Sequence, residues 1–213
     1  MKIIGHLPGS PEWDAARLGL PTASQVDRIM TPKKLNLSTQ SYTYRNQLLA
    51  EWLLGYSIDW SGQSGWMDRG TRMEEEARAY YEFKRDAEVR QVGFILREDG
   101  RFGGTPDGLV GDDGGVEIKC PALHTHIGYL VDSAALAVEY NGQTQAYMML
   151  ADRAWIDLLS YSPQLPPVLV RVERDQRYIS ALNTVLDAFL DNLEEARTKL
   201  AQYKVKLEQV AAA

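Results

Sequence analysis

The chain has 213 residues, of which 45% are hydrophobic and 24% are charged. It is therefore long enough to bury a core, and its composition excludes a disordered segment. Its 23 basic and 29 acidic residues give a formal net charge of −6. This charge argues against binding of nucleic acid over the whole surface, but it does not exclude a local binding site.

The single cysteine, Cys120, excludes an intramolecular disulfide and a thiolate-based zinc or iron–sulfur site. The first residues lack the apolar core of a signal peptide, and no stretch approaches the ~18–20 apolar residues of a membrane span. We therefore expect a cytoplasmic chain with no membrane anchor.

Hydrophobic periodicity predicts helices in the first part of the chain. Thr22-Ala-Ser24 offers hydroxyl N-caps to a short helix that stops before Pro32. A second helix is predicted over Ser38–Leu54, ended by Gly55, and a loop over Ser57–Gly65. A third is predicted over Asp68–Lys84, where apolar residues recur at helical spacing opposite a run of glutamates.

The pattern then changes to strands. Predicted strands and helices follow in this order: strands Val89–Leu96 and Phe102–Val110, a turn at Gly111–Gly115, strand Val116–Cys120, helix Ala135–Leu150, strands Trp155–Tyr161 and Val168–Glu173, and helix Ile179–Leu207. This order predicts an α/β or α+β fold over residues 1–213, a single domain in which helices flank a mixed central β-sheet and a long C-terminal helix follows.

Thr105-Pro-Asp107-Gly and Glu117-Ile-Lys119 contain the most informative residues. Glu117 and Lys119 are two apart on a predicted strand, so their side chains leave the same face. Folding about the Gly111–Gly115 turn places Asp107 within a residue or two of Lys119. Two carboxylates and one ammonium are therefore expected to converge.

These residue types suit metal-assisted hydrolysis of a phosphodiester. Asp107, Glu117 and the main-chain carbonyl of Ile118 are hard oxygen ligands for Mg²⁺, which would polarise a phosphoryl group. Lys119 would orient or deprotonate the attacking water, or offset charge that develops on the phosphate. The alternative is that Pro-Asp-Gly is an ordinary turn and that Glu117 and Lys119 lie on an exposed edge strand.

Four stretches in the same order resemble the PD-(D/E)xK nucleases of the YqaJ viral recombinase type, the family of bacteriophage lambda exonuclease. They are Pro11–Gly19 with Thr22-Ala-Ser24, Gly70–Phe83 with Glu74, Thr105–Pro121, and Tyr140–Gln145. The resemblance spans about Pro11 to Pro163 and implies a restriction-endonuclease-like core.

The resemblance implies a Mg²⁺-dependent 5′→3′ exonuclease, with Mn²⁺ as a substitute and two ions per site. Such an enzyme digests one strand of double-stranded DNA from its end and leaves a 3′ single-stranded overhang for recombination. It also implies a homotrimeric ring, a single-strand annealing protein as partner, and a phage or prophage gene expressed in a bacterial host. No segment of the sequence identifies a docking surface for that partner.

The resemblance also assigns roles to particular residues. Asp107 and Glu117 would bind the metal, Lys119 would serve the water nucleophile, and Glu74 would lie near a second metal. Arg17, Ser24, Thr105 and Gln143 match positions that receive a terminal 5′-phosphate. Simpler alternatives are a surface pair of Arg17 with Glu12 or Asp14, and plain helix capping by Ser24.

Further residues have weaker assignments. Lys33 and Lys34 are candidate contacts to the DNA backbone, with a solvated loop as the alternative. Trp66 and Met67 are candidates for a wedge between bases, with core packing as the alternative. The sequence does not favour zinc binding by His124 and His126 or nucleophilic attack by Cys120.

Two other functions compete with the exonuclease. One is a PD-(D/E)xK endonuclease, and the other is a non-catalytic scaffold that binds DNA ends during recombination. A Cas4-like nuclease is disfavoured because one cysteine cannot hold an iron–sulfur cluster. Retention of Asp107, Glu117 and Lys119 argues against the scaffold.

Overall fold

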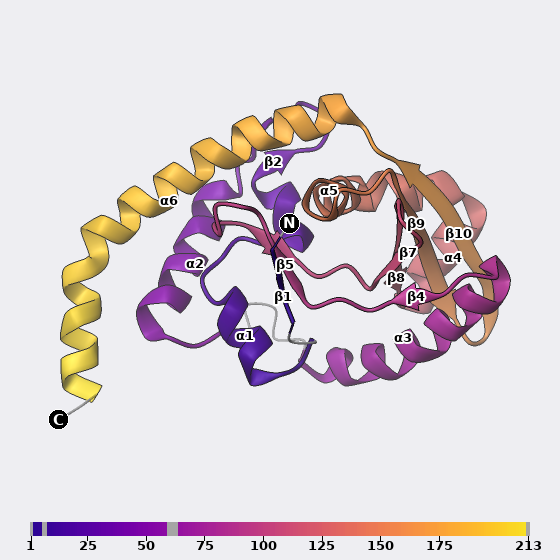
Figure 1. The fold of residues 1–213 in the computed structure, drawn as a ribbon, viewed down its shortest axis with the longest axis horizontal. Coiled ribbons are helices and arrows are strands. Elements are labelled where there is room, and N and C mark those ends of the chain that lie inside the picture. The colour runs from indigo at the N-terminus through magenta and orange to yellow at the C-terminus, as the bar shows by residue number, and fades with distance from the viewer. Residues whose placement is uncertain (1, 6–7, 59–63, 212–213) are drawn as a thin grey trace.

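The structure is a computed structural model that describes the backbone of residues 2–5, 8–58 and 64–211 (Figure 1). Its elements, in chain order, are β1 (Lys2–Ile4), α1 (Pro11–Arg17), the 3₁₀ helix η1 (Ala23–Arg28), β2 (Met30–Thr31), β3 (Asn36–Leu37), α2 (Ser41–Leu54), α3 (Ser64–Arg85), β4 (Val89–Arg90), β5 (Phe94–Leu96), β6 (Gly103–Gly104), β7 (Gly108–Val110), β8 (Gly114–Lys119), α4 (Leu123–Val131), α5 (Ser133–Ala151), β9 (Trp155–Ser162), β10 (Leu165–Glu173) and α6 (Gln176–Ala211). None of the helices, over the residues described, is long and apolar enough to cross a bilayer.

The central sheet has five strands in the order β10-β9-β8-β7-β4. Strands β8 and β9 are parallel, and the other neighbours are antiparallel, so the sheet is mixed as predicted. Its parallel pair requires a crossover connection, which α4 and α5 supply between β8 and β9. The predicted mixed α/β fold is confirmed.

Two predicted strands are each divided between separate sheets. Within Val89–Leu96, β4 pairs with β7, whereas β5 belongs to a three-stranded sheet of order β1-β5-β6. Within Phe102–Val110, β6 joins that smaller sheet and β7 joins the central one. The chain therefore crosses between the sheets at Gln91–Gly93 and again at Thr105–Asp107, so that the second crossing carries the predicted Pro-Asp segment.

Both faces of the central sheet are buried. One face joins the main core, in which α5 contributes Ala146, Tyr147 and Met148. The opposite face forms a smaller core with α3, which includes Tyr81, Val116 and Ile118 (Figure 1). Successive residues of β8 therefore face different layers, and Ile118 packs toward α3.

The long predicted helices are present with shifted ends. Helix α2 begins at Ser41 rather than Ser38 and ends at Leu54, and its cap, Gly55, has a φ of 77°, which explains why glycine stands there. The short helix after Thr22 is the 3₁₀ helix η1, and it ends at Arg28 because Met30 pairs with Leu37 in a small hairpin. Helices α1 and α4 were not predicted.

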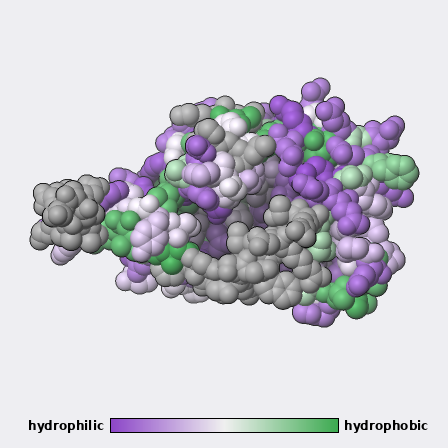
Figure 2. Space-filling model, turned by 90° about the horizontal axis from the view of Figure 1, so that it is seen from below, coloured by the Kyte–Doolittle hydropathy of each residue, from purple (hydrophilic) through white to green (hydrophobic). Residues whose placement is uncertain are grey.

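Helix α6 extends along one side of the molecule, packs on α2 and α5, and runs out toward the C-terminus (Figure 1). The N-terminal part of α6 is amphipathic, with Leu182, Leu186 and Phe189 buried in the main core. On the face shown in Figure 2, hydrophobic residues occur in small separate groups among hydrophilic ones.

Candidate active site

Strand β8 places Glu117 and Lys119 side by side on the face of the sheet opposite Ile118. The Nζ of Lys119 lies 2.8 Å from Oε1 of Glu117, and the Glu117 residue is only 3% exposed. Strand β8 is the third of five strands. The alternative of an exposed edge strand is therefore wrong, because β7 and β9 cover both edges of β8.

Asp107 joins this pair at the point where the chain enters β7. Gly108 pairs with Val116, so Asp107 lies beside the Glu117 end of β8. The backbone N–H of Ile118 donates to Oδ2 of Asp107 at 2.6 Å. The predicted convergence of Asp107, Glu117 and Lys119 is confirmed as a geometric fact.

Helix α5 covers the three residues with polar side chains. The Nε2 of Gln143 donates to Oε1 of Glu117 at 2.6 Å and to the hydroxyl of Tyr147 at 3.0 Å. The Nζ of Lys119 also donates to Oε1 of Gln143 at 3.2 Å. The predicted residue Gln143 therefore contacts both the carboxylate of Glu117 and the ammonium of Lys119.

Two tyrosines of α5 near the site were not predicted. Tyr147 binds Gln143 as described above, and the ring of Tyr140 lies 4.5 Å from Nζ of Lys119. Both lie three or four residues from Gln143, on the same face of the helix. That spacing from Gln143 on the predicted helix is the signal by which they could have been found.

The carboxylates are held in an environment that disfavours their charge. Burial, and then the adjacent Glu117, raise the pKa of Asp107 well above its ordinary value. Burial also raises the pKa of Glu117, and Lys119 only partly offsets this effect. Glu74 on α3 is close enough to raise the pKa of both groups, which places it beside the site.

Lys119 responds in the opposite way. Burial alone would lower the pKa of Lys119, but the Glu117 carboxylate and then Asp107 raise it, and the net shift is upward. The lysine is therefore a stable ammonium when both carboxylates are ionised. Its single positive charge neutralises one of the two carboxylates, so one negative charge remains to attract another cation.

One oxygen of Glu117 is left without a hydrogen-bond partner. Oε2 of Glu117 is buried and receives no hydrogen bond from the residues described. No cluster of three or more His, Cys, Asp or Glu side chains suited to a metal occurs in the described part of the chain. An ion bound between Asp107 and Glu117 would therefore also need main-chain oxygen and water as ligands.

Helix α1 brings Arg17 toward the same region through Trp13. The indole N–H of Trp13 donates to Oγ1 of Thr105 at 3.0 Å, and the guanidinium of Arg17 stacks 4.4 Å above the Trp13 ring. The charge of Arg17 is close enough to lower the pKa of Tyr147, against a larger effect of burial that raises it. Among the residues described, Arg17 forms no ion pair with Glu12 or Asp14, so that alternative is wrong.

Gly104 explains how Thr105 reaches this position. A Cβ at residue 104 would lie 2.7 Å from the Tyr147 ring and 2.8 Å from Ala23, so only glycine lets β6 pass between η1 and α5. Ser24 is exposed within η1, and its Oγ lies 3.2 Å from Oγ1 of Thr22. Ser24 is not the N-cap, because Thr22 holds that position.

The remaining candidates lie elsewhere. Lys33 and Lys34 are exposed on the turn between β2 and β3. The side chains of Trp66 and Met67 lie outside the described residues, although their backbone belongs to α3. His126 is buried between Ser160 and the carbonyl of Pro166, which is a structural role, and Cys120 is a half-buried free thiol.

Comparison with known proteins gives a consistent result. The family model described as the YqaJ-like viral recombinase domain matches residues 12–154. The chain is 36% identical to an alkaline exonuclease (LHK-Exo) from Laribacter hongkongensis, with a TM-score of 0.80, over 93% of this chain and 100% of that one. The structure of LHK-Exo in complex with dAMP gives a TM-score of 0.81 at the same identity and coverage.

A phage related exonuclease from Haemophilus somnus 129PT shares the fold, with a TM-score of 0.70. It is 17% identical, and the similarity covers 85% of this chain and 96% of that one. No curated protein sequence matches the chain.

Proposed function

The chain belongs to the YqaJ-like viral recombinase family, and on that basis we propose that it is a metal-dependent 5′→3′ exonuclease. The substrate is one strand of linear double-stranded DNA, digested from a 5′-phosphorylated end. The product is a 3′ single-stranded overhang for recombination by single-strand annealing. The similarity to LHK-Exo, whose complex with dAMP has been solved, supports the release of 5′-mononucleotides.

One observation supports this function most directly: the buried, unpartnered Oε2 of Glu117 beside Asp107. Two buried carboxylates with raised pKa values and one ammonium form a site that is short of positive charge. Hard oxygen donors of this kind suit Mg²⁺, which keeps part of its water shell and binds phosphate oxygens. The residues present therefore fit the ion.

Asp107, Glu117 and the carbonyl of Ile118 would hold Mg²⁺, with Mn²⁺ as a substitute, and Glu74 would serve a second ion. When bound, Mg²⁺ supplies Lewis-acid activation of the scissile phosphate and of a water molecule. Gln143 fixes the Glu117 carboxylate by donating to Oε1, which leaves Oε2 free for the ion.

Lys119 acts on the water nucleophile and on the charge that develops at phosphorus. Its ammonium is held by Glu117, Gln143 and the Tyr140 ring, so its position is fixed before the substrate arrives. The raised pKa of Lys119 favours an ammonium that orients the water and stabilises the developing charge.

Arg17, Thr105, Ser24 and Gln143 form the proposed pocket for the terminal 5′-phosphate. A guanidinium presents two donors to phosphate oxygens, and hydroxyl groups add neutral donors. Trp13 connects two of these groups, because it binds Thr105 and carries Arg17 on its ring. Lys33 and Lys34 would contact the DNA backbone, and Trp66 and Met67 would separate its strands.

The proposal extends to assembly. A homotrimeric ring would enclose the DNA, and a single-strand annealing protein would receive the 3′ overhang. An acidic chain could then act on DNA with binding confined to an internal site that divalent ions neutralise.

Three substrates test the function: linear duplex with a 5′-phosphate, the same duplex with a 5′-hydroxyl, and closed circular duplex, each with Mg²⁺ or with EDTA. We expect Mg²⁺-dependent loss of the linear substrates, faster for the phosphorylated ends, with mononucleotides detected by mass spectrometry. Cutting of the closed circle would favour an endonuclease. Binding of ends with no hydrolysis in Mg²⁺ would favour the scaffold.

A further inference from the structure

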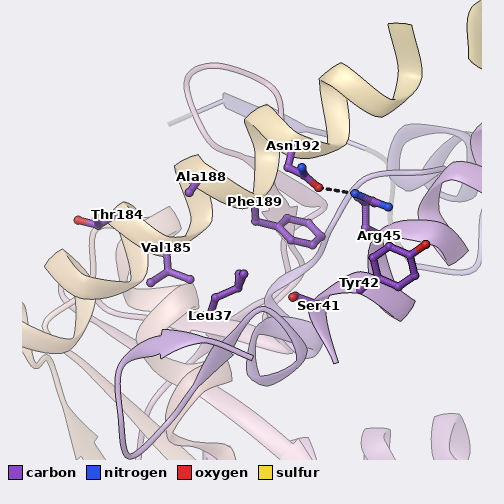
Figure 3. A pocket seen from close by; sticks show the side chains of 9 residues that line it. All are labelled: Leu37, Ser41, Tyr42, Arg45, Thr184, Val185, Ala188, Phe189 and Asn192. Atoms are coloured by element: carbon purple, nitrogen blue, oxygen red, sulfur yellow. Dashed lines mark hydrogen bonds between the residues drawn. The ribbon is translucent and has the colours of Figure 1, made fainter. Parts of the chain in front are cut away.

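A groove lies between α2 and α6, built from elements that supply none of the residues of the candidate active site (Figure 3). Its volume is about 530 Å³. Its lining residues come from β3, from the start of α2 and from about two and a half turns of α6: Leu37, Ser41, Tyr42, Arg45, Thr184, Val185, Ala188, Phe189 and Asn192. A ligand bound there would leave Asp107, Glu117 and Lys119 accessible.

The floor of the groove is apolar and preformed. Phe189 is buried and stacks on Tyr44 with ring centroids 6.0 Å apart, which fixes the floor to the main core. Leu37 is 55% exposed and Tyr42 is 66% exposed. Large apolar side chains left at the edges of a rigid concave surface are typical of a site that binds another protein.

The groove is also positively charged at one end. Arg45 donates to the side-chain oxygens of Asn46 and Asn192 and stacks 4.7 Å above the Tyr42 ring (Figure 3). Both hydrogen-bond partners are neutral amides, and no acidic residue lines the groove. The guanidinium charge is therefore uncompensated on a chain whose net charge is −6.

The acidic residues of the same part of α6 do not neutralise Arg45. Asp187 pairs with Arg97, and Asp191 pairs with Arg101, each at 2.8 Å on the side of α6 that faces the β5–β6 connection. The helix dipole adds partial positive charge at the N-terminus of α2, and no acidic residue in the first turn of α2 offsets it.

We propose that the α2–α6 groove docks a short segment of a partner protein that inserts apolar side chains between α2 and α6 and places a carboxylate on Arg45. Charge complementarity between Arg45 and a carboxylate favours this occupant over nucleic acid and over a second copy of this chain. A single cation in the lining is too few for a nucleic-acid backbone, which needs several. A second copy of this chain in a two-fold symmetric contact would bring two such cationic grooves together with no lining carboxylate between them. In the proposed ring the contacts are heterologous, so the solution molar mass of the groove variants distinguishes a neighbouring copy from a partner protein.

Three acetylated peptides of about 15 residues test the proposal, the length of a segment that lies in a helix-binding groove. The first has leucines at helical spacing flanked by glutamates. The second replaces the glutamates by lysines, and the third replaces the leucines by alanines. Binding to the full chain is measured by fluorescence anisotropy, and we expect the first peptide to bind at least about tenfold more tightly than either control.

Matched variants locate the binding. Arg45→Glu reverses the charge in the groove, Ala188→Trp fills the groove, and Arg177→Glu reverses an exposed charge outside it. We expect Arg45→Glu to weaken the acidic peptide about tenfold or more and to improve binding of the lysine peptide, a reversal that unfolding would not produce. Ala188→Trp should weaken the acidic peptide, and Arg177→Glu should have no effect.

Several outcomes would overturn the proposal. They are equal binding of all three peptides, no saturation below about 1 mM, or no response to Arg45→Glu. A molar mass in solution that falls only in Ala188→Trp would assign the groove to a second copy of this chain. Binding of a single-stranded oligonucleotide that is lost in Tyr42→Ala would assign it to nucleic acid. Nuclease assays on the same variants should be unchanged, so failure here is distinct from failure of the proposed function.

Discussion

Lys119 donates from Nζ to Oε1 of Glu117 at 2.8 Å, while Oε2 of the same carboxylate has no hydrogen-bond partner among the described residues. One oxygen is therefore held by protein and the other is available. Gln143 reinforces this division, because it also donates to Oε1. The arrangement orients a carboxylate for a cation and fixes the ammonium next to it.

Lys119→Met tests the role of the ammonium. We expect turnover of 5′-phosphorylated duplex to fall by about 10²-fold or more, the usual loss when one fixed donor is removed from a developing anion. Binding of DNA ends, measured by gel shift in Ca²⁺, should be retained. Lys199→Met on the exposed part of α6 is the control, and unchanged turnover in Lys119→Met would remove Lys119 from the mechanism.

Asp107→Asn tests the paired carboxylates as a cation site. Divalent ions should raise the Tm of the wild-type chain with increasing concentration, since an ion bound only by the folded state stabilises it. This rise should be absent in Asp107→Asn and retained in Glu75→Gln, an exposed residue of α3. In the absence of ions and at neutral pH we expect the variant to melt above the wild type, because burial and Glu117 raise the pKa of Asp107 and its charge then opposes folding. An equal response of both variants to Ca²⁺ would contradict the assignment.

The sequence predicted the central hairpin well because its determinants are local. The turn at Gly111–Asp113, shorter than the predicted Gly111–Gly115, sets the register of Asp107 against β8, and alternation along a strand puts Glu117 and Lys119 on one face. The predicted reflection about that turn differed from the observed register by about two residues. This difference did not separate the three groups.

Other features depend on contacts between distant residues. The sequence of Val89–Leu96 reads as one strand. In the structure it forms two, β4 and β5, because its first part pairs with β7 and its last part pairs with β1. Helix α1 has seven residues and no buried side chain, so it has no hydrophobic periodicity. Its signals were Ser10, which accepts from the Trp13 amide, and Pro11 in the first turn. The bond from Trp13 to Thr105 spans 92 residues and had no local signal.

Arg17→Ala tests the proposed pocket for the 5′-phosphate. A guanidinium that donates to a phosphate contributes about 1.5–3 kcal/mol, so we expect the rate on phosphorylated ends to fall by about tenfold or more. The rate on 5′-hydroxyl ends should change little, and the ratio of the two rates is the measurement. Arg90→Ala, at an exposed position of β4, is the control. An equal loss on both kinds of end would refute the pocket.

Asp157→Asn tests a buried ion-pair cluster behind the sheet. Asp157 is fully buried, accepts two hydrogen bonds from Arg171 and one from Tyr81, and lies 3.2 Å from Arg85. Breaking a buried pair costs about 3–5 kcal/mol, and the lower end applies because both arginines reach solvent. We expect the Tm to fall by about 6–12 °C for a chain of this size.

Asp187→Asn is the matched control for that cluster, since Asp187 pairs with Arg97 at the surface. Its Tm should change by less than about 4 °C, because exposed pairs contribute about 1 kcal/mol or less. Equal losses in the two variants would show that burial of Asp157 does not determine its contribution. Nuclease activity at low temperature should survive in both.

Asp27→Asn tests a pH dependence located between η1 and α5. Oδ1 of Asp27 is buried with no hydrogen-bond partner among the residues described, and it lies directly over Gly142. Burial raises the pKa of Asp27 above its ordinary value of 3.8. Between that value and the raised pKa, the folded state binds more protons than the unfolded state, so this group's contribution to stability decreases as the pH rises.

At neutral pH the charge of Asp27 therefore destabilises the folded state to its full extent, and in acid, where the carboxyl is protonated, it does not destabilise it. We expect Asp27→Asn to melt above the wild type at pH 7, by at most about 1 kcal/mol or about 2–4 °C, because it removes the charge and keeps the shape. The difference should shrink as the pH falls toward about 4. Melting curves of both chains across this range measure it, with Asp112→Asn, at an exposed position of the turn after β7, as the control. A difference that is constant with pH would show that the charge of Asp27 is not its cause.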